Sequence, residues 1–203
     1  MLPDWAKSSL KPERNLIRTI APSQLEKRIV LTQTPLGENK ELNLRRGKII
    51  HQLLQILPEI PKNARLKVLK NFLAQPSLLL NAEHQKNYAK EILTVLERSD
   101  FSFFFGPNSR SEVPVTGYIG KNIVSGQVDR LVIGPKKISV VDFKTNFSVP
   151  PSVNEVPKQY LAQMAAYKFV LKKIFPTHNV ECVLLWTQKP SFMLLPEEIL
   201  KEK

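Results

Sequence analysis

Cysteine is nearly absent from this sequence, because Cys182 is the single thiol among 203 residues. An internal disulfide and a cysteine-held zinc or iron–sulfur cluster within the chain are therefore excluded. No run of about 18 apolar residues occurs, so no transmembrane helix is expected. The first residues also lack the apolar stretch of a signal peptide. These absences together predict a cytoplasmic protein with no iron–sulfur cluster and no membrane partner.

The sequence also contains no Gly-x-x-x-x-Gly-Lys-Ser/Thr phosphate loop, so no ATP site of that kind is expected in this chain. It has no internal repeat and no low-complexity tract. Its 203 residues are enough to bury a sizeable core. We expect a polar tail or linker at 1–20, followed by a single domain at 21–203.

Acidic residues are scarce relative to basic ones, with 18 Asp and Glu against 30 Lys and Arg. The formal net charge of +12 favours a polyanionic partner, with nucleic acid ahead of an anionic membrane surface. A basic surface that is simply solvated is the alternative explanation. The aromatic run 101–105 is expected to lie in the core rather than to stack on bases. The net charge therefore indicates a class of partner but does not identify a reaction.

The clearest chemical signal lies in two apolar runs, 126–133 and 138–145, which are rich in Val and Ile. The Gly-Pro-Lys-Lys segment at 134–137 separates them, and this arrangement predicts a β-hairpin. Each run carries a carboxylate, Asp129 or Asp142, where a core residue is expected. A buried charge is costly unless it is paired or binds a metal. Two such carboxylates on adjacent strands predict a functional site.

The expected register of this hairpin brings the two carboxylates together. If Ile133 faces Ile138, the same pairing places Asp129 opposite Asp142, with Cβ atoms about 4.5–5.5 Å apart. Strand alternation puts Lys144 on the same face as Asp142. Two carboxylates at that distance repel each other unless a cation lies between them. Oxygen ligands suit a hard ion such as Mg²⁺.

Helical and strand patterns alternate along the rest of the chain. Residues with one apolar face predict four helices, at 43–57, 63–75, 82–98 and 157–175. Apolar runs bounded by turns predict four strands, at 112–119, 122–133, 138–145 and 180–186. A strand, a crossover helix and a further strand imply a partly parallel sheet with a right-handed connection. The predicted fold class is therefore α/β, a mixed β-sheet flanked by helices with a helical N-terminal part.

Several polar residues lie at ambiguous positions in these elements. His51 is at the edge of an apolar helix stripe, where it is either a packed histidine or a ligand. Gly47, one turn earlier, leaves room for something to approach the imidazole. Gln163 lies on a buried helix stripe with Tyr167 one turn later, and the pair can simply hydrogen-bond in the core. Glu112 is either a third acid near the site or a solvated glutamate at a strand end.

Four short motifs follow one another in a fixed order. They are Gly-x-x-x-His at 47–51, Gly-Gln-Val-Asp-Arg at 126–130, Val-Val-Asp-Phe-Lys-Thr at 140–145 and Gln-x-x-x-Tyr at 163–167. This combination resembles the PD-(D/E)xK nuclease superfamily and, within it, the RecB-like branch. The resemblance spans about residues 22–200 and implies a restriction-endonuclease-like core. It is strongest to the C-terminal nuclease domain of bacterial AddA helicase–nucleases, whose helicase part is absent here.

The resemblance implies a metal site and assigns roles to its residues. His51, Asp129, Asp142 and the backbone carbonyl of Phe143 would hold Mg²⁺ or Mn²⁺, which polarises the scissile phosphate and lowers the pKa of a bound water. The catalytic residues would be Asp129, Asp142 and Lys144. Lys144 would orient or help to deprotonate the water and steady the charge on the phosphate. Water would attack directly, with no covalent enzyme intermediate.

Gln163, Tyr167 and Arg130 would position the DNA and support the site. The implied function is a metal-dependent exonuclease acting on single-stranded DNA ends in double-strand break repair and recombination. Its implied partners are a helicase and an AddB-like subunit. One alternative is a catalytically idle DNA-binding or scaffolding remnant of a split helicase–nuclease gene, although intact acids argue against decay. Another is a structure-selective or RNA-directed nuclease that uses the same site.

Overall fold

The computed structural model describes residues 19–22 and 38–201. Residues 1–18 of the expected tail lie outside this part of the chain. Thr19 and Ile20, the last two residues of that segment, form strand β1 (Thr19–Ile20) and pair with the sheet. Within the described residues, no helix is both long enough and apolar enough to cross a membrane.

The predicted helices and strands are present, with ends shifted by a few residues. The helices are α2 (Glu38–Ile56), α3 (Lys62–Leu73), α4 (Ala82–Glu97), α5 (Lys158–Ile174) and the short α6 (Glu197–Leu200). The remaining strands are β2 (Ser109–Ile119), β3 (Asn122–Ile133), β4 (Lys137–Lys144), β5 (Asn179–Trp186) and β6 (Ser191–Leu195). Strand β6 was not predicted, because its five residues follow a turn and alternate in exposure without a long apolar run.

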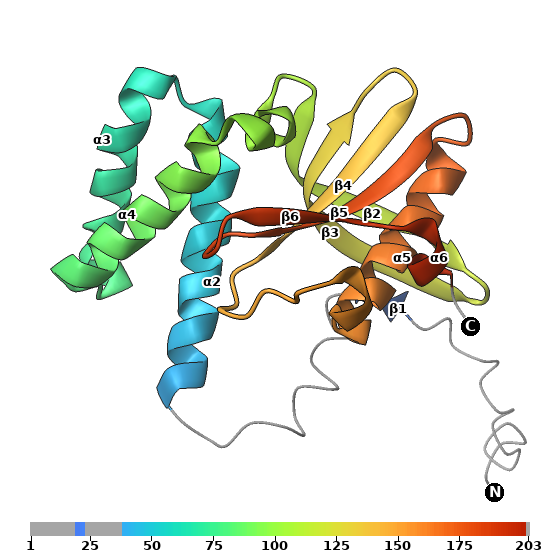
Figure 1. Cartoon of the computed structure of the whole chain (residues 1–203), viewed down its shortest axis with the longest axis horizontal. Helices are drawn as coiled ribbons and strands as arrows, with labels where there is room; N and C mark the ends of the chain where they lie inside the picture. The colour runs from blue at the N-terminus through green and yellow to red at the C-terminus, as the bar shows by residue number, and fades with distance from the viewer. Residues whose placement is uncertain (1–18, 23–37, 202–203) are drawn as a thin grey trace, which may run out of the picture.

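The strands form one mixed sheet of six strands, in the order β1-β3-β4-β5-β6 with β2 on the other edge of β3 (Figure 1). Strands β4 and β5 are parallel, and α5 is the crossover helix between them. Strands β3 and β4 pair antiparallel, as the predicted hairpin requires, and β2 pairs antiparallel with β3. The expected mixed sheet flanked by helices is therefore confirmed.

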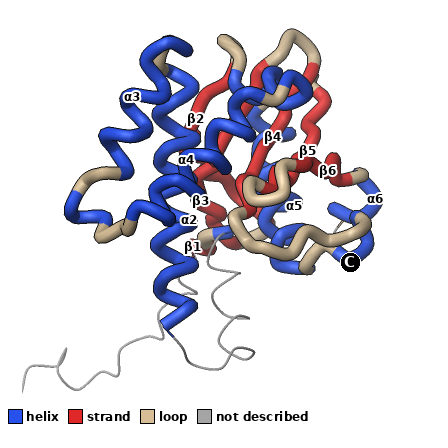
Figure 2. The backbone as a smooth tube through the Cα atoms, turned by 60° about the vertical axis from the view of Figure 1, so that its left-hand side comes forward, coloured by secondary structure: helices blue, strands red, loops and turns tan. Residues whose placement is uncertain are grey.

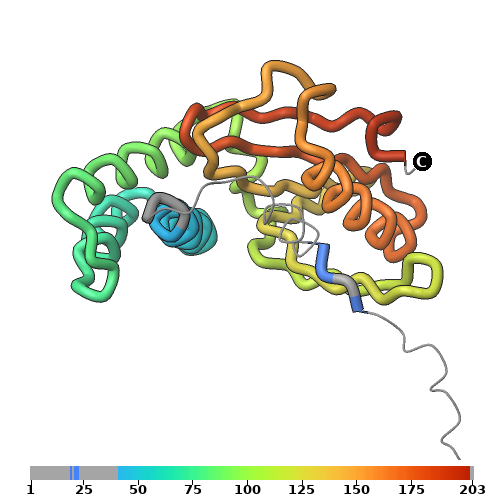
Figure 3. Tube along the Cα trace, turned by 90° about the horizontal axis from the view of Figure 1, so that it is seen from below, coloured from blue at the N-terminus to red at the C-terminus, as the bar shows by residue number. Residues whose placement is uncertain are grey.

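Helices cover both faces of this sheet. Helices α2, α3 and α4 lie together on one side, whereas α5 and α6 lie on the other (Figures 1 and 3). Each side has its own apolar core, one built around Leu53, Leu54 and Phe143 and the other around Tyr167 and Trp186. Strand β4 is buried at every position after its first. Any charged side chain on β4 is therefore enclosed from both directions.

Two predictions about apolar residues have different outcomes. The aromatic run belongs to the core, since Phe101 and Phe104 are buried, although Phe103 between them is 53% exposed. The apolar face predicted for the helix at 157–175 does not extend to its end, where Ile174 is also 53% exposed. It is the last residue of the helix, and Phe175 beyond it packs against the core instead.

One edge of β3 is shared by two different strands. Strand β1 pairs with residues 123–124 of β3, and β4 pairs with residues 130–133 (Figure 2). Strand β2 occupies the opposite edge along nearly the whole length. At residues 125–129, between β1 and β4, this edge of β3 pairs with no other strand among the described residues. Side chains therefore contact the backbone N–H and C=O groups there. This opening contains the motif around Asp129.

Candidate active site

The hairpin register is as predicted from Ile133–Ile138 to Arg130–Val141, and the ladder ends there. Asp129 and Asp142 therefore do not form the regular cross-strand pair that the sequence predicts. Instead, the Asp129 carboxylate accepts a hydrogen bond of 2.6 Å from the backbone N–H of Phe143. The side chain takes the place of a backbone partner and lies beside the peptide bond that follows Asp142. The strands separate at the point where the two acids are located.

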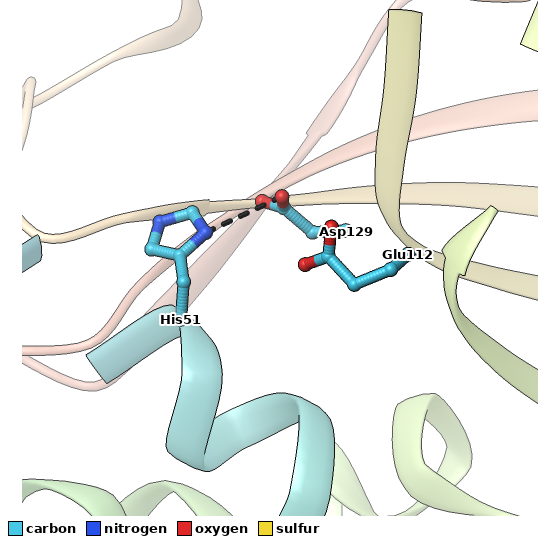
Figure 4. A group of neighbouring side chains, drawn as sticks. All are labelled: His51, Glu112 and Asp129. Atoms are coloured by element: carbon cyan, nitrogen blue, oxygen red, sulfur yellow. Dashed lines mark ion pairs between the residues drawn. The ribbon is translucent and has the colours of Figure 1, made fainter. Parts of the chain in front are cut away.

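Three potential ligands from distant segments meet at this opening (Figure 4). His51 Nδ1 lies 3.3 Å from Asp129 Oδ1, and Glu112 approaches from β2. One ligand atom from each of the three residues lies within 4.8 Å of the other two. Bonds of about 2.0–2.1 Å to Mg²⁺ allow two ligand atoms to be up to about 4.2 Å apart. A small movement of these side chains would therefore let one ion contact all three.

Glu112 reaches the cluster because the backbone of β2 is irregular at this residue. Its φ of 50° lies in the left-handed region, which costs a residue other than glycine about 1–3 kcal/mol. The β2–β3 ladder omits the pair Glu112–Asp129, and Gln127 Nε2 donates to the Glu112 carbonyl at 3.1 Å. Burial raises the pKa of the Glu112 carboxyl, as do the nearby charges of Asp129 and Asp142, whereas His51 opposes the shift. Glu112 is thus a third acid at the site and not a solvated strand end.

Asp142 and Lys144 form a buried ion pair on β4. Their side chains are 7% and 8% exposed, and Lys144 Nζ lies 2.8 Å from Asp142 Oδ2. The same ammonium donates to Gln163 Oε1 at 3.2 Å and lies 3.6 Å from the centre of the Tyr160 ring. Burial raises the pKa of Asp142 to about 6, against the opposing attraction of Lys144. The lysine is held in one place by an acid, an amide and an aromatic face.

The surroundings of His51 favour the protonated imidazole. Loss of water around the imidazole lowers its pKa, but the charge of Asp129 and the hydrogen bond to it outweigh this effect. With a smaller contribution from Asp142, they raise the pKa of His51 to about 9. A metal ligand must release this proton, so metal binding and protonation compete at His51.

Tyr167 and Gly126 belong to different motifs, and the structure shows why both are needed. The Tyr167 hydroxyl donates to the carbonyl of Gln127 at 2.8 Å, in the opening between β1 and β4. Burial raises the pKa of Tyr167 to about 12, so the hydroxyl remains a donor. A Cβ atom on Gly126 would lie 2.8 Å from the Tyr167 oxygen. Glycine is therefore the residue that lets the tyrosine cross the strand.

Gly47 has a similar role on α2. A Cβ atom there would lie 3.1 Å from Thr145 Oγ1, so the space beside Gly47 is taken by the end of β4. The neighbouring Arg46 donates to the Thr145 carbonyl and to both oxygens of Glu91, at 2.6 and 2.8 Å. Thr187, at the end of β5, donates to Glu91 at 2.5 Å. This buried network joins α2 and α4 to the ends of the two central strands.

Sequence reasoning missed Arg46 and Glu91 because they lie 45 positions apart and belong to separate helices. A charged residue on an amphipathic helix is normally solvated. One signal was available, since Arg46 directly precedes the Gly-x-x-x-His motif. Its 7% exposure is decided by the packing of α2 against Thr145.

Arg130, which the motifs imply would position DNA or support the site, lies inside the protein. Its side chain is fully buried, and it donates to Ser109 Oγ at 3.1 Å and to the Leu54 carbonyl at 3.3 Å. It also lies 3.5 Å from Glu59. Arg130 therefore connects the sheet to the C-terminal part of α2. Tyr167, at 1% exposure, is likewise an internal residue and not a surface for DNA.

The remaining site residues share one pocket of about 650 Å³. All four motifs contribute to its lining, through Gly47, His51, Asp129, Asp142, Lys144 and Gln163. Carboxylate oxygens dominate the donor set, with one imidazole nitrogen. This chemistry fits a hard divalent ion such as Mg²⁺ or Mn²⁺ better than a soft one.

Comparison with known proteins identifies the class. The sequence profile of the PD-(D/E)XK nuclease superfamily matches residues 24–192, and the chain belongs to this superfamily. No curated protein matches the chain. Among solved structures, the crystal structure of SSO0001 aligns with 97% of this chain and 76% of that chain, at 14% sequence identity and a TM-score of 0.36.

Membership of the superfamily confirms two expectations from the sequence. The fold is of the restriction-endonuclease-like type, and the protein is of a nuclease class that acts on DNA with divalent metal ions. The similarity to AddA proteins in particular stays a prediction.

Proposed function

We propose that this protein is a cytoplasmic Mg²⁺- or Mn²⁺-dependent deoxyribonuclease that hydrolyses single-stranded DNA from its ends. In this proposal it is the nuclease part of an AddAB-type helicase–nuclease in double-strand break repair and recombination, and residues 21–203 form its single domain. The observation that supports the catalytic part is the meeting of His51, Asp129 and the Asp142–Lys144 pair in one pocket. Isolated acids on a surface would not give this combination.

His51, Asp129 and Glu112 would hold the ion, together with Asp142 and the backbone carbonyl of Phe143. When bound, the ion would polarise the scissile phosphate and lower the pKa of a water molecule. Glu112 is an addition to the ligand set implied by the motifs. Its support is the 4.8 Å grouping with His51 and Asp129.

Lys144 would orient the attacking water and stabilise charge on the phosphate. Its position supports this role, because Asp142 and Gln163 hold its Nζ atom at 2.8 and 3.2 Å. Gln163 would act on the reaction by placing Lys144. Tyr167 would maintain the opening in which Asp129 lies.

The test is cleavage of end-labelled single-stranded and duplex oligonucleotides with Mg²⁺, Mn²⁺ or EDTA. We expect metal-dependent cleavage, and we expect Asp142→Ala and Lys144→Ala to abolish it, by about a thousandfold or more for loss of a transition-state contact. Lys137→Ala is the matched control, because Lys137 is on the same strand and also pairs with an acid, Glu181, at 3.1 Å. Binding of DNA without cleavage by the folded wild-type protein would favour the scaffolding alternative.

A further inference from the structure

A second hollow of about 810 Å³ lies on the other side of α2 from the catalytic pocket. It is bounded by α2, α4 and the segment that follows β4, which lie next to one another in Figures 1 and 3. Asn43 lines both hollows. Lys144, Thr145 and Asn146 line the pocket, and the next residue, Phe147, lines the groove. The groove therefore begins just after the end of β4.

The groove presents aromatic rings that contact a cation or one another. Phe147 is 57% exposed, and the guanidinium of Arg46 lies 5.2 Å from the centre of its ring. The same guanidinium lies 5.9 Å from the centre of the Tyr88 ring, and His84 stacks on Tyr88 with centroids 5.9 Å apart. Arg46 is itself held by Glu91 and Thr145. Phe147 thus has one ring face on a buried arginine and much of its remaining surface open to solvent.

The charge of the groove is positive. Its lining contains the cations Arg45, Arg46 and Lys90 and one acid, Glu91. Glu91 is neutralised by Arg46 at 2.6 Å, with both side chains largely buried. Arg45 and Lys90 therefore leave an excess of positive charge at the surface. A positive groove with exposed aromatic rings is the arrangement that binds single-stranded nucleic acids by stacking and charge.

We propose that this groove is a subsite for the unpaired part of the DNA strand that is cut in the pocket. A base stacks on Phe147, and Arg45 and Lys90 contact the adjacent phosphates. Paired bases within a duplex do not offer a free face to Phe147, so the subsite selects single strands. The course of the bound strand from the groove to the pocket rests on the proposed nuclease function.

The subsite and Lys144 are close together along the chain. Three peptide links join Lys144 to Phe147, so their Cα atoms are at most about 11 Å apart. At about 3.4 Å for each stacked nucleotide, a backbone span of this length covers at most about three nucleotide steps.

The direct test measures binding of 12-nucleotide single strands by fluorescence anisotropy in EDTA, with one abasic site moved through the sequence. Wild-type protein is expected to lose about tenfold in affinity when the abasic site falls on the stacked nucleotide. Phe147→Ala is expected to lose about tenfold for the intact strand and to become insensitive to that abasic site. Equal affinities of wild type and Phe147→Ala, or an unchanged abasic profile, would overturn the proposal.

Matched variants separate stacking from general apolar contact. Phe103→Ala is the control, since Phe103 is 53% exposed and also has a cation over its ring, Lys137 at 5.7 Å. It is expected to bind as wild type does. Phe147→Trp is expected to retain affinity, and Phe147→Leu to lose it. If Phe147→Leu binds as tightly as wild type, the stacking subsite is wrong.

The salt dependence of binding gives an independent measurement that does not need a Phe147 variant. Arg45→Ala and Lys90→Ala are each expected to reduce the slope of log K against log salt by about 0.7, the value for one phosphate contact on a single strand. Lys67→Ala, which removes an exposed lysine on α3, is expected to leave the slope unchanged. Unchanged slopes in both groove variants would contradict the proposal.

The subsite and the proposed nuclease function fail in different experiments. If wild-type protein shows the abasic profile and the Phe147 dependence but never cleaves with Mg²⁺ or Mn²⁺, the subsite stands and the nuclease function fails. If wild-type protein cleaves single strands and Phe147→Ala cleaves them with the same KM and abasic profile, the nuclease function stands and the subsite fails. Absence of single-strand binding by wild type at low salt also overturns the subsite.

Discussion

Helix α2 separates two hollows of opposite chemical character. On one side, His51 faces the acids Glu112, Asp129 and Asp142 in a pocket built from sequence motifs. On the other side, Arg45 and Phe147 line a basic and aromatic groove that includes none of the key motif residues. The pocket holds its groups through buried contacts with fixed distances, as phosphodiester chemistry requires. The groove needs only charge and a ring face, so its residues stay near the surface.

Arg46 lines the groove, donates to the Thr145 carbonyl beside the pocket, and offers the largest expected effect on stability. Arg46→Met breaks a buried pair and leaves Glu91 without its cation, so we expect a loss of about 3–5 kcal/mol in the free energy of unfolding. Urea unfolding measures this loss. Arg98→Met is the matched control, because Arg98 contacts Asp100 at the same 2.6 Å but on the surface, and it is expected to change stability little. Similar losses in both variants would show that burial of the Arg46 pair is unimportant.

Stabilisation by a metal ion should depend on the residues of the pocket and not on those of the groove. At Mn²⁺ concentrations near 100 times the dissociation constant, we expect about 2.7 kcal/mol of added stability, measured as a rise in Tm. His51→Ala and Asp129→Asn should each reduce the rise, and so should Glu112→Gln if the third acid is a ligand. Phe147→Ala, in the groove, should leave the rise intact. An undiminished rise in Glu112→Gln would remove that residue from the ligand set.

The close contact between Gly126 and Tyr167 should couple two motifs. Gly126→Ala places a methyl group 2.8 Å from the Tyr167 oxygen, so we expect a loss of about 1–3 kcal/mol in the free energy of unfolding. Tyr167→Phe removes that oxygen and should recover part of the loss in the double variant. Gly120→Ala offers a contrast, because nothing lies within 4 Å of a Cβ atom there and only its φ of +58° opposes the change. Strict additivity of the Gly126 and Tyr167 variants would contradict the proposed clash.

The pH dependence of stability should differ between two pocket residues. His51 has a folded pKa of about 9 against an ordinary 6.5, so its ion pair stabilises fully below pH 6.5 and this contribution is lost as the pH rises to about 9. Asp142 has a folded pKa of about 6 against 3.8, so stability falls as the pH rises from about 4 to 6.

Thermal unfolding in EDTA across this pH range separates the two contributions. His51→Gln should remove the fall in stability between pH 6.5 and 9. Asp142→Asn should remove the fall in stability between pH 4 and 6. Arg45→Ala in the groove should keep both. If stability still falls between pH 6.5 and 9 in His51→Gln, a different titrating group causes that fall.

Much of the fold and part of the site could be predicted from the sequence. Periodicity located the helices and strands, and the turn at 134–137 set the register as far as Arg130–Val141. The prediction failed one pair later, because Asp129 bonds the backbone N–H of Phe143 with its side chain. Motif order supplied His51, whose own helix gave no clear signal. No local pattern distinguished Glu112 from an ordinary strand-end acid.

The sequence by itself determined the nuclease class, the mixed sheet and the hairpin as far as Arg130–Val141, because motif order, hydrophobic periodicity and turn residues are local features of the chain. The tertiary structure alone decided that Glu112 joins the cluster and that Arg130 is internal. The first outcome depends on the irregular backbone of β2 at Glu112, and the second on the packing of the C-terminal part of α2 against β3. Contacts between residues far apart in the chain create both features, and no local pattern encodes them.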